Sequence, residues 1–273
     1  MPHETLIVDR DGPVLKVTLN RPETRNALSQ AMVQELGDVF AQARDDEGVS
    51  AVVLSGAGGN FCAGGDFRGM QARTASDEGG SGSGDKVTFS NRRFGALLQA
   101  INELPKAVIV LIEGAAMGGA VGLIAVADWV IAEKGAQIGT PEVTVGIVPA
   151  QITPFIVQRI GTAHARRLTA FGMRLGAEEA ARIGLVHEVA EGPHALRDKG
   201  AAAISQVLRC APGAVAETKR LLQRSLEGPT TLAPLLDEAA GMFAASLAGE
   251  AKEGIRAFLE KRKPAWVAKV DMP

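Results

Sequence analysis

The longest apolar stretch of the chain runs from Ala107 to Ala132, and glycines crowd its middle. Glycine weakens a helix interior by about 1 kcal/mol relative to alanine, so each of them needs a structural reason. The stretch is nearly long enough to cross a bilayer, but Glu113 and Asp128 interrupt it, and burying two carboxylates in lipid is costly. A buried strand at 106–113 followed by a glycine-led helix explains the same residues. The sequence therefore predicts a strand–turn–helix unit and no membrane association.

The composition indicates a globular protein without a surface for nucleic acid. The chain has 273 residues, 46% of them apolar, and a formal net charge of −2. Nucleic-acid-binding proteins cluster lysine and arginine on one face, so no nucleic-acid partner is expected. Cys62 and Cys210 form neither a CxxC pair nor a metal-ligand spacing with the four histidines, so no metal site is expected. With an N-terminus that lacks a signal-peptide pattern, these features predict a cytoplasmic location.

Alternating strand and helix patterns predict an α/β layered fold. A hairpin is expected around Asp11-Gly12, followed by an amphipathic helix that Ser29 caps. Four further elements are predicted in order along the chain: a mobile Gly/Ser-rich loop at 72–86, a helix at 90–105, helices from Thr153 onward, and among them a short strand at 185–189.

Two glycine-led turns, each directly after a buried strand, predict a ligand site. "FCAGGDF" follows "AVVLSGAG", and "GAAMGGAVG" follows "AVIVLIEG". Neither turn has a standard phosphate-binding pattern, and the chain has no G-x-S-x-G elbow, so phosphate transfer and a hydrolase triad are weakly supported. Two facing backbone N–H groups could instead bind one oxygen and stabilise the enolate of a thioester. The glycines could equally serve only tight turns and close packing, and spacing alone leaves both interpretations open.

Five motifs resemble those of the enoyl-CoA hydratase/isomerase (crotonase) superfamily: "NRPETRNALS", "GAGGNFCAGGD", "EGAAMGGAVGLIAVAD", "IGTPEVTVGIVPA" and "AFLEKRKPAW". The resemblance extends from about Thr5 to Trp266. It implies a crotonase-like spiral of ββα units at 1–195 and a C-terminal helical region at 196–273 that completes a homotrimer or a dimer of trimers. The substrate would be an acyl-CoA thioester, with no separate cofactor.

The resemblance also implies the site residues. The oxyanion hole falls on the backbone N–H groups of Gly65 and Gly119, and Glu142 of "GTPE" matches one of the two catalytic glutamates typical of the family. Contacts to coenzyme A are implied for Arg25, Ala27, Ala63, Asp66, Phe67, Arg68, Phe258 and Lys261, of which Lys261 would reach the coenzyme A of a neighbouring subunit. The substrate pocket is expected to include Gly122, Ala150 as an N–H anchor for water, and Arg92 and Arg93 for a free substrate carboxylate.

The second glutamate of the family is missing, because its position is Gly122 here. Hydration needs water activated toward Cβ and a proton delivered to Cα, so Glu142 would orient the water, move the proton, or do both in turn. A single glutamate also suits double-bond isomerisation, and a non-catalytic protein that binds coenzyme A esters is a third alternative. The finer pattern, including "VPAQITPFIVQRIG", resembles hydratases of 3-methylglutaconyl-CoA and isohexenylglutaconyl-CoA, from leucine and isoprenoid degradation. Gly122 is then expected to enlarge the pocket beside a branched Cβ.

Overall fold

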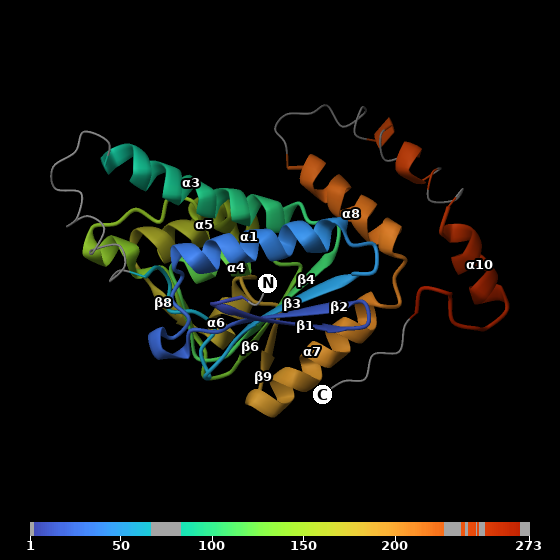
Figure 1. Ribbon diagram of the computed structural model, residues 1–273, viewed down its shortest axis with the longest axis horizontal. Helices are drawn as coiled ribbons and strands as arrows, with labels where there is room; N and C mark the ends of the chain where they lie inside the picture. Colours follow the sequence, from blue (N-terminus) through green and yellow to red (C-terminus); the bar gives the residue numbers. More distant parts are fainter. Residues whose placement is uncertain are drawn as a thin grey trace.

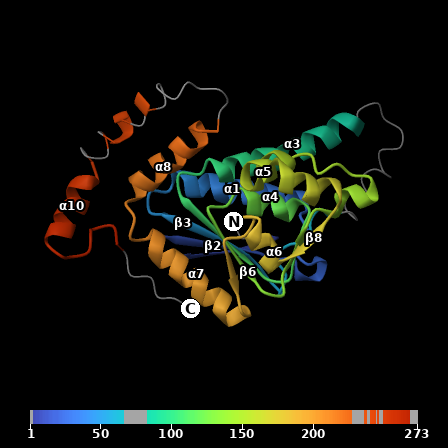
Figure 2. The ribbon, with the colours of Figure 1, turned by 180° about the vertical axis from the view of Figure 1, so that it is seen from behind.

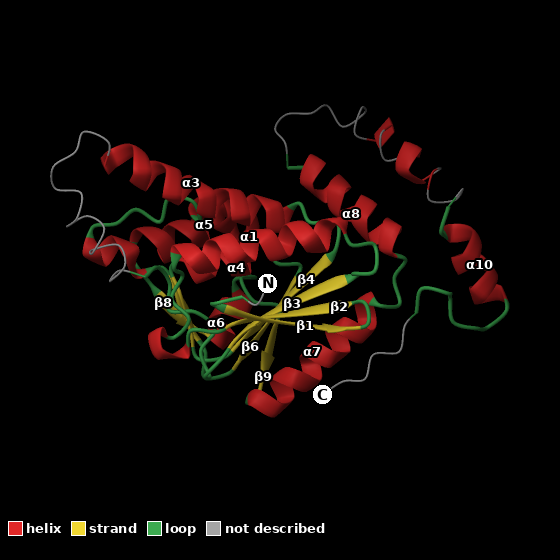
Figure 3. Cartoon of the chain, in the orientation of Figure 1, coloured by secondary structure: helices red, strands yellow, loops and turns green. Residues whose placement is uncertain are grey.

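The computed structural model describes residues 3–66, 83–226, 236–237, 240–243, 245 and 249–267. Its centre is a six-stranded sheet in the order β1-β2-β3-β4-β6-β9, drawn in yellow in Figure 3. Only the β1–β2 hairpin is antiparallel, which confirms the turn predicted at Asp11-Gly12. The strands are β1 (Leu6–Asp11), β2 (Val14–Leu19), β3 (Ala51–Gly56), β4 (Ala107–Ile112), β6 (Trp129–Glu133) and β9 (Glu188–Ala190).

Helices cover both faces of this sheet, so its central strands are buried on two sides. In Figure 1, α1, α3, α4 and α5 lie above the sheet and α7 lies below it. Successive side chains of β3 point to opposite faces of the sheet. Val52 and Leu54 belong to the apolar cluster on one face, and Val53 belongs to the cluster on the other face, together with Ile204 of α7. These helices are α1 (Gln30–Asp45), α3 (Ser83–Asn102), α4 (Gly119–Ala125), α5 (Thr153–Ala170) and α7 (Pro193–Val207).

A small second sheet fixes the start of α4. It has the order β5-β7-β8 and pairs Met117 with Gly139. The Gly118 N–H then donates to the Gly139 carbonyl at 2.8 Å, so the first sheet, the second sheet and the glycine turn are joined at one point. The strands are β5 (Ala115–Met117), β7 (Gln137–Gly139) and β8 (Arg174–Gly176). The short helices are η1 (Pro22–Thr24), η2 (Pro141–Val145) and α6 (Ala177–Arg182).

Local sequence patterns predicted most elements correctly, and the structure corrects two of the predicted boundaries. The Ser29 hydroxyl accepts from the Met32 N–H at 3.1 Å, which confirms the predicted cap of α1. The segment Ser83–Lys86, predicted as the end of a loop, is the first turn of α3, although serine and glycine have low helix propensities. The rest of that predicted loop lies outside the described residues. The strand predicted at 185–189 is β9, which begins only at Glu188.

The C-terminal helices lie to one side of the sheet. Figures 1 and 2 show α8 (Pro212–Arg224) next to the core and α10 (Ala251–Leu259) beyond it. Lys219 attaches α8, because its ammonium donates to the Asp128 carboxylate at 2.5 Å and to the Lys106 carbonyl at 2.8 Å. The boundary predicted between 195 and 196 falls inside α7, which packs on the sheet. Among the described helices, none has the length and apolarity to cross a bilayer.

Candidate active site

The two glycine-led turns contact one another at the carboxyl ends of the strands that precede them, β3 and β4. Cys62 forms an isolated parallel β-bridge with Ala116, in which the Met117 N–H donates to the Cys62 carbonyl at 2.9 Å. Gly64 and Gly118 both have positive φ, at 96° and 56°. A Cβ atom at Gly64 would lie 2.8 Å from the Met117 carbonyl oxygen, and one at Gly118 would lie 3.7 Å from the Gly64 Cα. Backbone therefore touches backbone here, and side chains would separate the turns.

The backbone N–H groups of Gly65 and Gly119 are the donors in these turns that make no backbone hydrogen bond to a described residue. In the bridge between Leu28 and Gly65, the Leu28 N–H donates to the Gly64 carbonyl at 2.7 Å and the Asp66 N–H to the Leu28 carbonyl at 3.2 Å. Gly119 opens α4, and the first N–H groups of a helix have no partner within it. Within the part of the chain that the structure describes, neither N–H donates a backbone hydrogen bond. Both stay available for the predicted oxyanion role.

Glu142 lies directly against the second glycine turn. Its Oε1 would be 2.8 Å from a Cβ atom at Gly118, the residue before the predicted oxyanion donor. The preceding Thr140 anchors the segment, since its N–H donates to the Met173 carbonyl at 3.2 Å and its hydroxyl to the Leu168 carbonyl at 2.9 Å. The geometry therefore presents a fixed carboxyl group beside the two N–H donors.

The electrostatic surroundings of Glu142 suit proton transfer. Its Oε2 is buried and makes no hydrogen bond to any described residue. Desolvation by burial raises the pKa of Glu142 above its ordinary value, while a hydrogen bond from its own backbone lowers it less. A carboxyl group whose pKa is raised holds a proton more readily, so it can accept one and return it.

Apolar side chains form the wall beside these donors. A Cβ atom at Gly119 would lie 2.8 Å from the Leu28 Cδ1 and 3.3 Å from the Phe94 Cζ. At Gly122, such an atom would lie 2.5 Å from the Ile152 Cγ2, and Leu98 is also in contact. The expectation that Gly122 enlarges the pocket beside Cβ is therefore wrong, because these side chains close in on the glycine and fill the space.

Two residues that the sequence argument passed over support the first glycine turn. The Arg21 guanidinium donates to the Ala27 carbonyl at 2.8 Å and pairs with the Asp66 carboxylate at 3.2 Å. Asn26 is fully buried; its amide donates to the Asn60 carbonyl at 2.7 Å and accepts from the Arg21 N–H at 2.9 Å. Both residues stand in the "NRPETRNALS" motif, so an arginine and an asparagine flanking Arg25 were the available signal.

The predicted coenzyme A contacts divide into three groups. Arg25, Ala27, Ala63 and Asp66 lie together on the first glycine turn, where the Ala63 N–H donates to the Arg25 carbonyl at 2.9 Å. Phe67 and Arg68 lie outside the described residues. Lys261 is exposed just after α10, the helix that contains Phe258, and Figure 1 shows α10 on the far side of α8 from α4. One chain therefore does not bring Lys261 to its own glycine turns.

Of the predicted pocket residues, Ala150 lies just before α5, and Arg92 and Arg93 lie on α3. The Ala150 N–H donates to the Val148 carbonyl at 2.7 Å, so it is not free to anchor a water as expected. Arg92 and Arg93 are both exposed on α3. Arg92 lies beside Gln151, since its Nη1 would be 3.4 Å from a Cβ atom at Gly95, a point that Gln151 also contacts.

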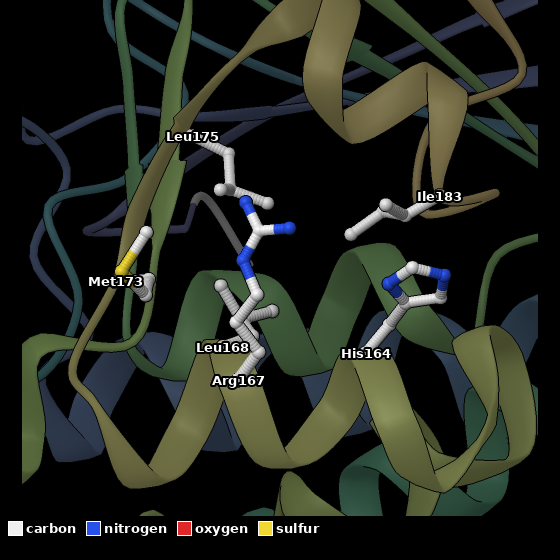
Figure 4. A pocket seen from close by; sticks show the side chains of 6 residues that line it. All are labelled: His164, Arg167, Leu168, Met173, Leu175 and Ile183. Carbon is white, nitrogen blue, oxygen red and sulfur yellow. The ribbon is translucent and has the colours of Figure 1, made fainter.

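A small depression lies elsewhere, between α5, β8 and α6 (Figure 4). Its lining contains no predicted site residue, and Arg167 at its edge pairs with Glu179 at 2.8 Å. Within the described ranges, no group of three or more histidine, cysteine, aspartate or glutamate side chains could hold a metal ion. The lining residues are His164, Arg167, Leu168, Met173, Leu175 and Ile183.

Known proteins match this arrangement over nearly the whole chain. The family model described as enoyl-CoA hydratase/isomerase matches residues 9–269. An enoyl-CoA hydratase/isomerase from Marinobacter aquaeolei is 48% identical with a TM-score of 0.92, covering 97% of this chain and 100% of its own. Pseudomonas aeruginosa AtuE is 45% identical with a TM-score of 0.91 and the same coverage.

Several curated proteins with similar sequences are named as hydratases. A 2,3-dehydroadipyl-CoA hydratase from Escherichia coli is 32% identical over 263 residues, which is 95% of this chain and 97% of that protein. The glycine turns, the facing carboxyl group and the mixed α/β core agree with these matches. The chain belongs to the enoyl-CoA hydratase/isomerase family, and enoyl-CoA hydration is its activity.

Proposed function

We propose that the protein hydrates a branched glutaconyl-CoA thioester, 3-methylglutaconyl-CoA or isohexenylglutaconyl-CoA, with Glu142 as its only acid–base carboxylate. The observation that carries this proposal is the position of Glu142, whose Oε1 lies against Gly118 at the oxyanion turn. The motif pattern around Gly122 and "VPAQITPF" supports the choice of substrate.

One carboxylate can complete the reaction if it acts twice. Ionised Glu142 takes a proton from water while the water oxygen bonds to Cβ. The electron pair of the double bond moves toward the thioester, and the N–H groups of Gly65 and Gly119 stabilise the resulting enolate oxygen. The neutral carboxyl group then returns the proton to Cα, so the product has gained one water and Glu142 is ionised again.

A second carboxylate on the substrate would explain the polar end of the α3 wall. Gln151 donates to the Asn91 side chain at 2.9 Å, and Arg92 lies beside this pair, two residues before Phe94 in α3. A guanidinium pairs well with a carboxylate. The Escherichia coli relative is named for 2,3-dehydroadipyl-CoA, an acyl thioester of a dicarboxylic acid. We infer that Arg92 receives the free carboxylate of a glutaconyl substrate.

Arg92→Gln is therefore expected to lower kcat/KM for 3-methylglutaconyl-CoA by about 10-fold, because one charge-assisted contact is lost. The kcat/KM for crotonyl-CoA, which has no second carboxylate, should be unchanged. Arg93→Gln is the matched control, since Arg93 is also exposed but lies about 100° further round α3. Equal losses on both substrates, or an equal loss in the Arg93 variant, would contradict this role.

We also propose that three or six copies assemble and that the protein is cytoplasmic. The large exposed apolar side chains of the C-terminal helices support assembly, since a monomer gains nothing from exposing Leu222, Ile255 and Leu259. Lys261 could then reach the coenzyme A of a neighbouring copy. Light scattering should give a mass three or six times that of one chain, and a monomer would contradict the proposal.

The cysteines support the cytoplasmic location, because both are free thiols, as expected in a reducing compartment.

A further inference from the structure

We infer that Ile152 prevents a second carboxylate in this site, because it occupies the space that a side chain at position 122 would need. The inference rests on the proposed role of Glu142 as the acid–base group. It makes Ile152 a positioning residue that determines which enoyl thioesters are hydrated, acting through Gly122.

The geometry of α4 sets the direction of any side chain at position 122. Gly118 and Gly122 are four residues apart, so they lie on one face of the helix start. Side chains on a helix tilt toward its N-terminus, so a carboxylate at 122 would point back toward Gly118. Since the Glu142 Oε1 lies against Gly118, the two carboxylates would face the same reaction space.

Ile152 and Leu98 fill that direction. Beyond its contact at 2.5 Å through Cγ2, the Ile152 Cβ would be 3.3 Å from a Cβ atom at Gly122, and the Leu98 Cδ1 would be 2.9 Å from it. Ile152 is only 3% exposed, and Leu98 is fully buried. A glutamate at 122 therefore forces the ends of these two side chains to shift, which costs stability.

Ile152 cannot easily move aside. It caps the N-terminus of α5, where its carbonyl accepts from the Ile156 N–H at 3.0 Å, and the Thr153 hydroxyl binds the Pro149 carbonyl at 2.6 Å. A β-branched side chain also has few rotamers. Its Cγ2 methyl group, the atom nearest to a Cβ atom at Gly122, is a part of the side chain that Ile152→Ala removes.

The site is therefore apolar where the family's second glutamate would stand. Two carboxylates close together raise one another's pKa and demand water around them. The isoleucine and leucine side chains instead leave hydrocarbon in that place. We expect straight-chain esters to gain most from a second water-activating group, so their hydration is the reaction that this apolar packing limits.

The test is a double-mutant cycle with Gly122→Glu and Ile152→Ala. Gly122→Glu alone should lower the melting temperature by at least about 5 °C and reduce activity on every substrate, because the new side chain meets Ile152. In the Ile152→Ala background the same substitution should cost little stability. It should also raise kcat/KM for crotonyl-CoA at least about 10-fold over Ile152→Ala alone. The pH profile of kcat in the double variant should then show a second carboxyl ionisation.

A matched control separates this role from general loss of packing. Ile204→Ala removes the same side chain from the other core cluster, on α7, and should not rescue Gly122→Glu. Additive melting-temperature losses, or a Gly122→Glu protein as stable and active as the natural one, would overturn the inference. Failure of the proposed function would look different, because Glu142→Gln would keep its activity while the stability coupling between positions 122 and 152 remained.

Discussion

Glu142→Gln is expected to lower the kcat of enoyl-CoA hydration by about 10²–10⁴-fold while leaving the affinity for acyl-CoA esters nearly unchanged. Glutamine has the same size as glutamate but cannot take a proton from water or return one to Cα. The Michaelis constant and a titration with a product thioester measure binding, and initial rates measure turnover. Glu133→Gln, on β6, is the matched control and should keep full activity. Comparable turnover in both variants would mean that another group transfers the proton.

The raised pKa of Glu142 gives the same variant a second, independent signature. Because burial disfavours its ionised form, the folded protein holds this proton more tightly than the unfolded chain does. The contribution of Glu142 to the free energy of unfolding is therefore lost as pH rises from the ordinary glutamate range through the raised pKa. Glu142→Gln should gain stability relative to the natural protein across that window. The kcat/KM of the natural protein should rise over the same window, as Glu142 ionises.

Gly119→Pro is expected to lower kcat by about 10²–10³-fold, because it deletes one of the two N–H groups that stabilise the enolate oxygen. Proline is tolerated at the first position of a helix, where its missing N–H breaks no helical hydrogen bond, so α4 itself should persist. The kcat and the melting temperature should be measured together.

Gly119→Ala separates the lost donor from added bulk. Both variants bring a Cβ atom toward the Leu28 Cδ1 and the Phe94 ring, but alanine keeps the N–H. The alanine variant should therefore lose much less activity than the proline variant. Equal losses in two folded variants would show that packing at position 119, and not the N–H group, supports the reaction.

The elements that local patterns encode were predictable from the sequence. The hairpin at Asp11-Gly12, the Ser29 cap and the strands before both glycine turns all follow from turn chemistry, capping and runs of apolar residues. The meeting of the turns at Gly64 and Gly118 came from the resemblance to the family, because spacing alone left tight turns as an equal explanation. The contact between their backbones now gives these glycines their physical reason.

Features that depend on contacts between distant segments were not predictable in the same way. Nothing near Gly122 in the sequence indicates that Ile152, thirty residues later, would fill the space beside it. The start of α3 at Ser83 was hidden by serine and glycine, whose propensities argue against a helix. The supports of the first glycine turn, Arg21 and Asn26, stand in a recognised motif, but the partners of their hydrogen bonds, including the Asn60 carbonyl and the Asp66 carboxylate, lie far along the chain.

The central claim, that Glu142 alone drives the addition of water to a branched glutaconyl thioester, has one direct test. The natural protein and Glu142→Gln are each incubated with 3-methylglutaconyl-CoA and with crotonyl-CoA in isotopically labelled water, and the products are analysed by mass spectrometry. The natural protein should place one labelled oxygen on Cβ, with a higher kcat/KM for 3-methylglutaconyl-CoA, and Glu142→Gln should form almost none of this product. Conversion without a labelled oxygen, a preference for crotonyl-CoA, or full labelling by the Gln variant would contradict the account.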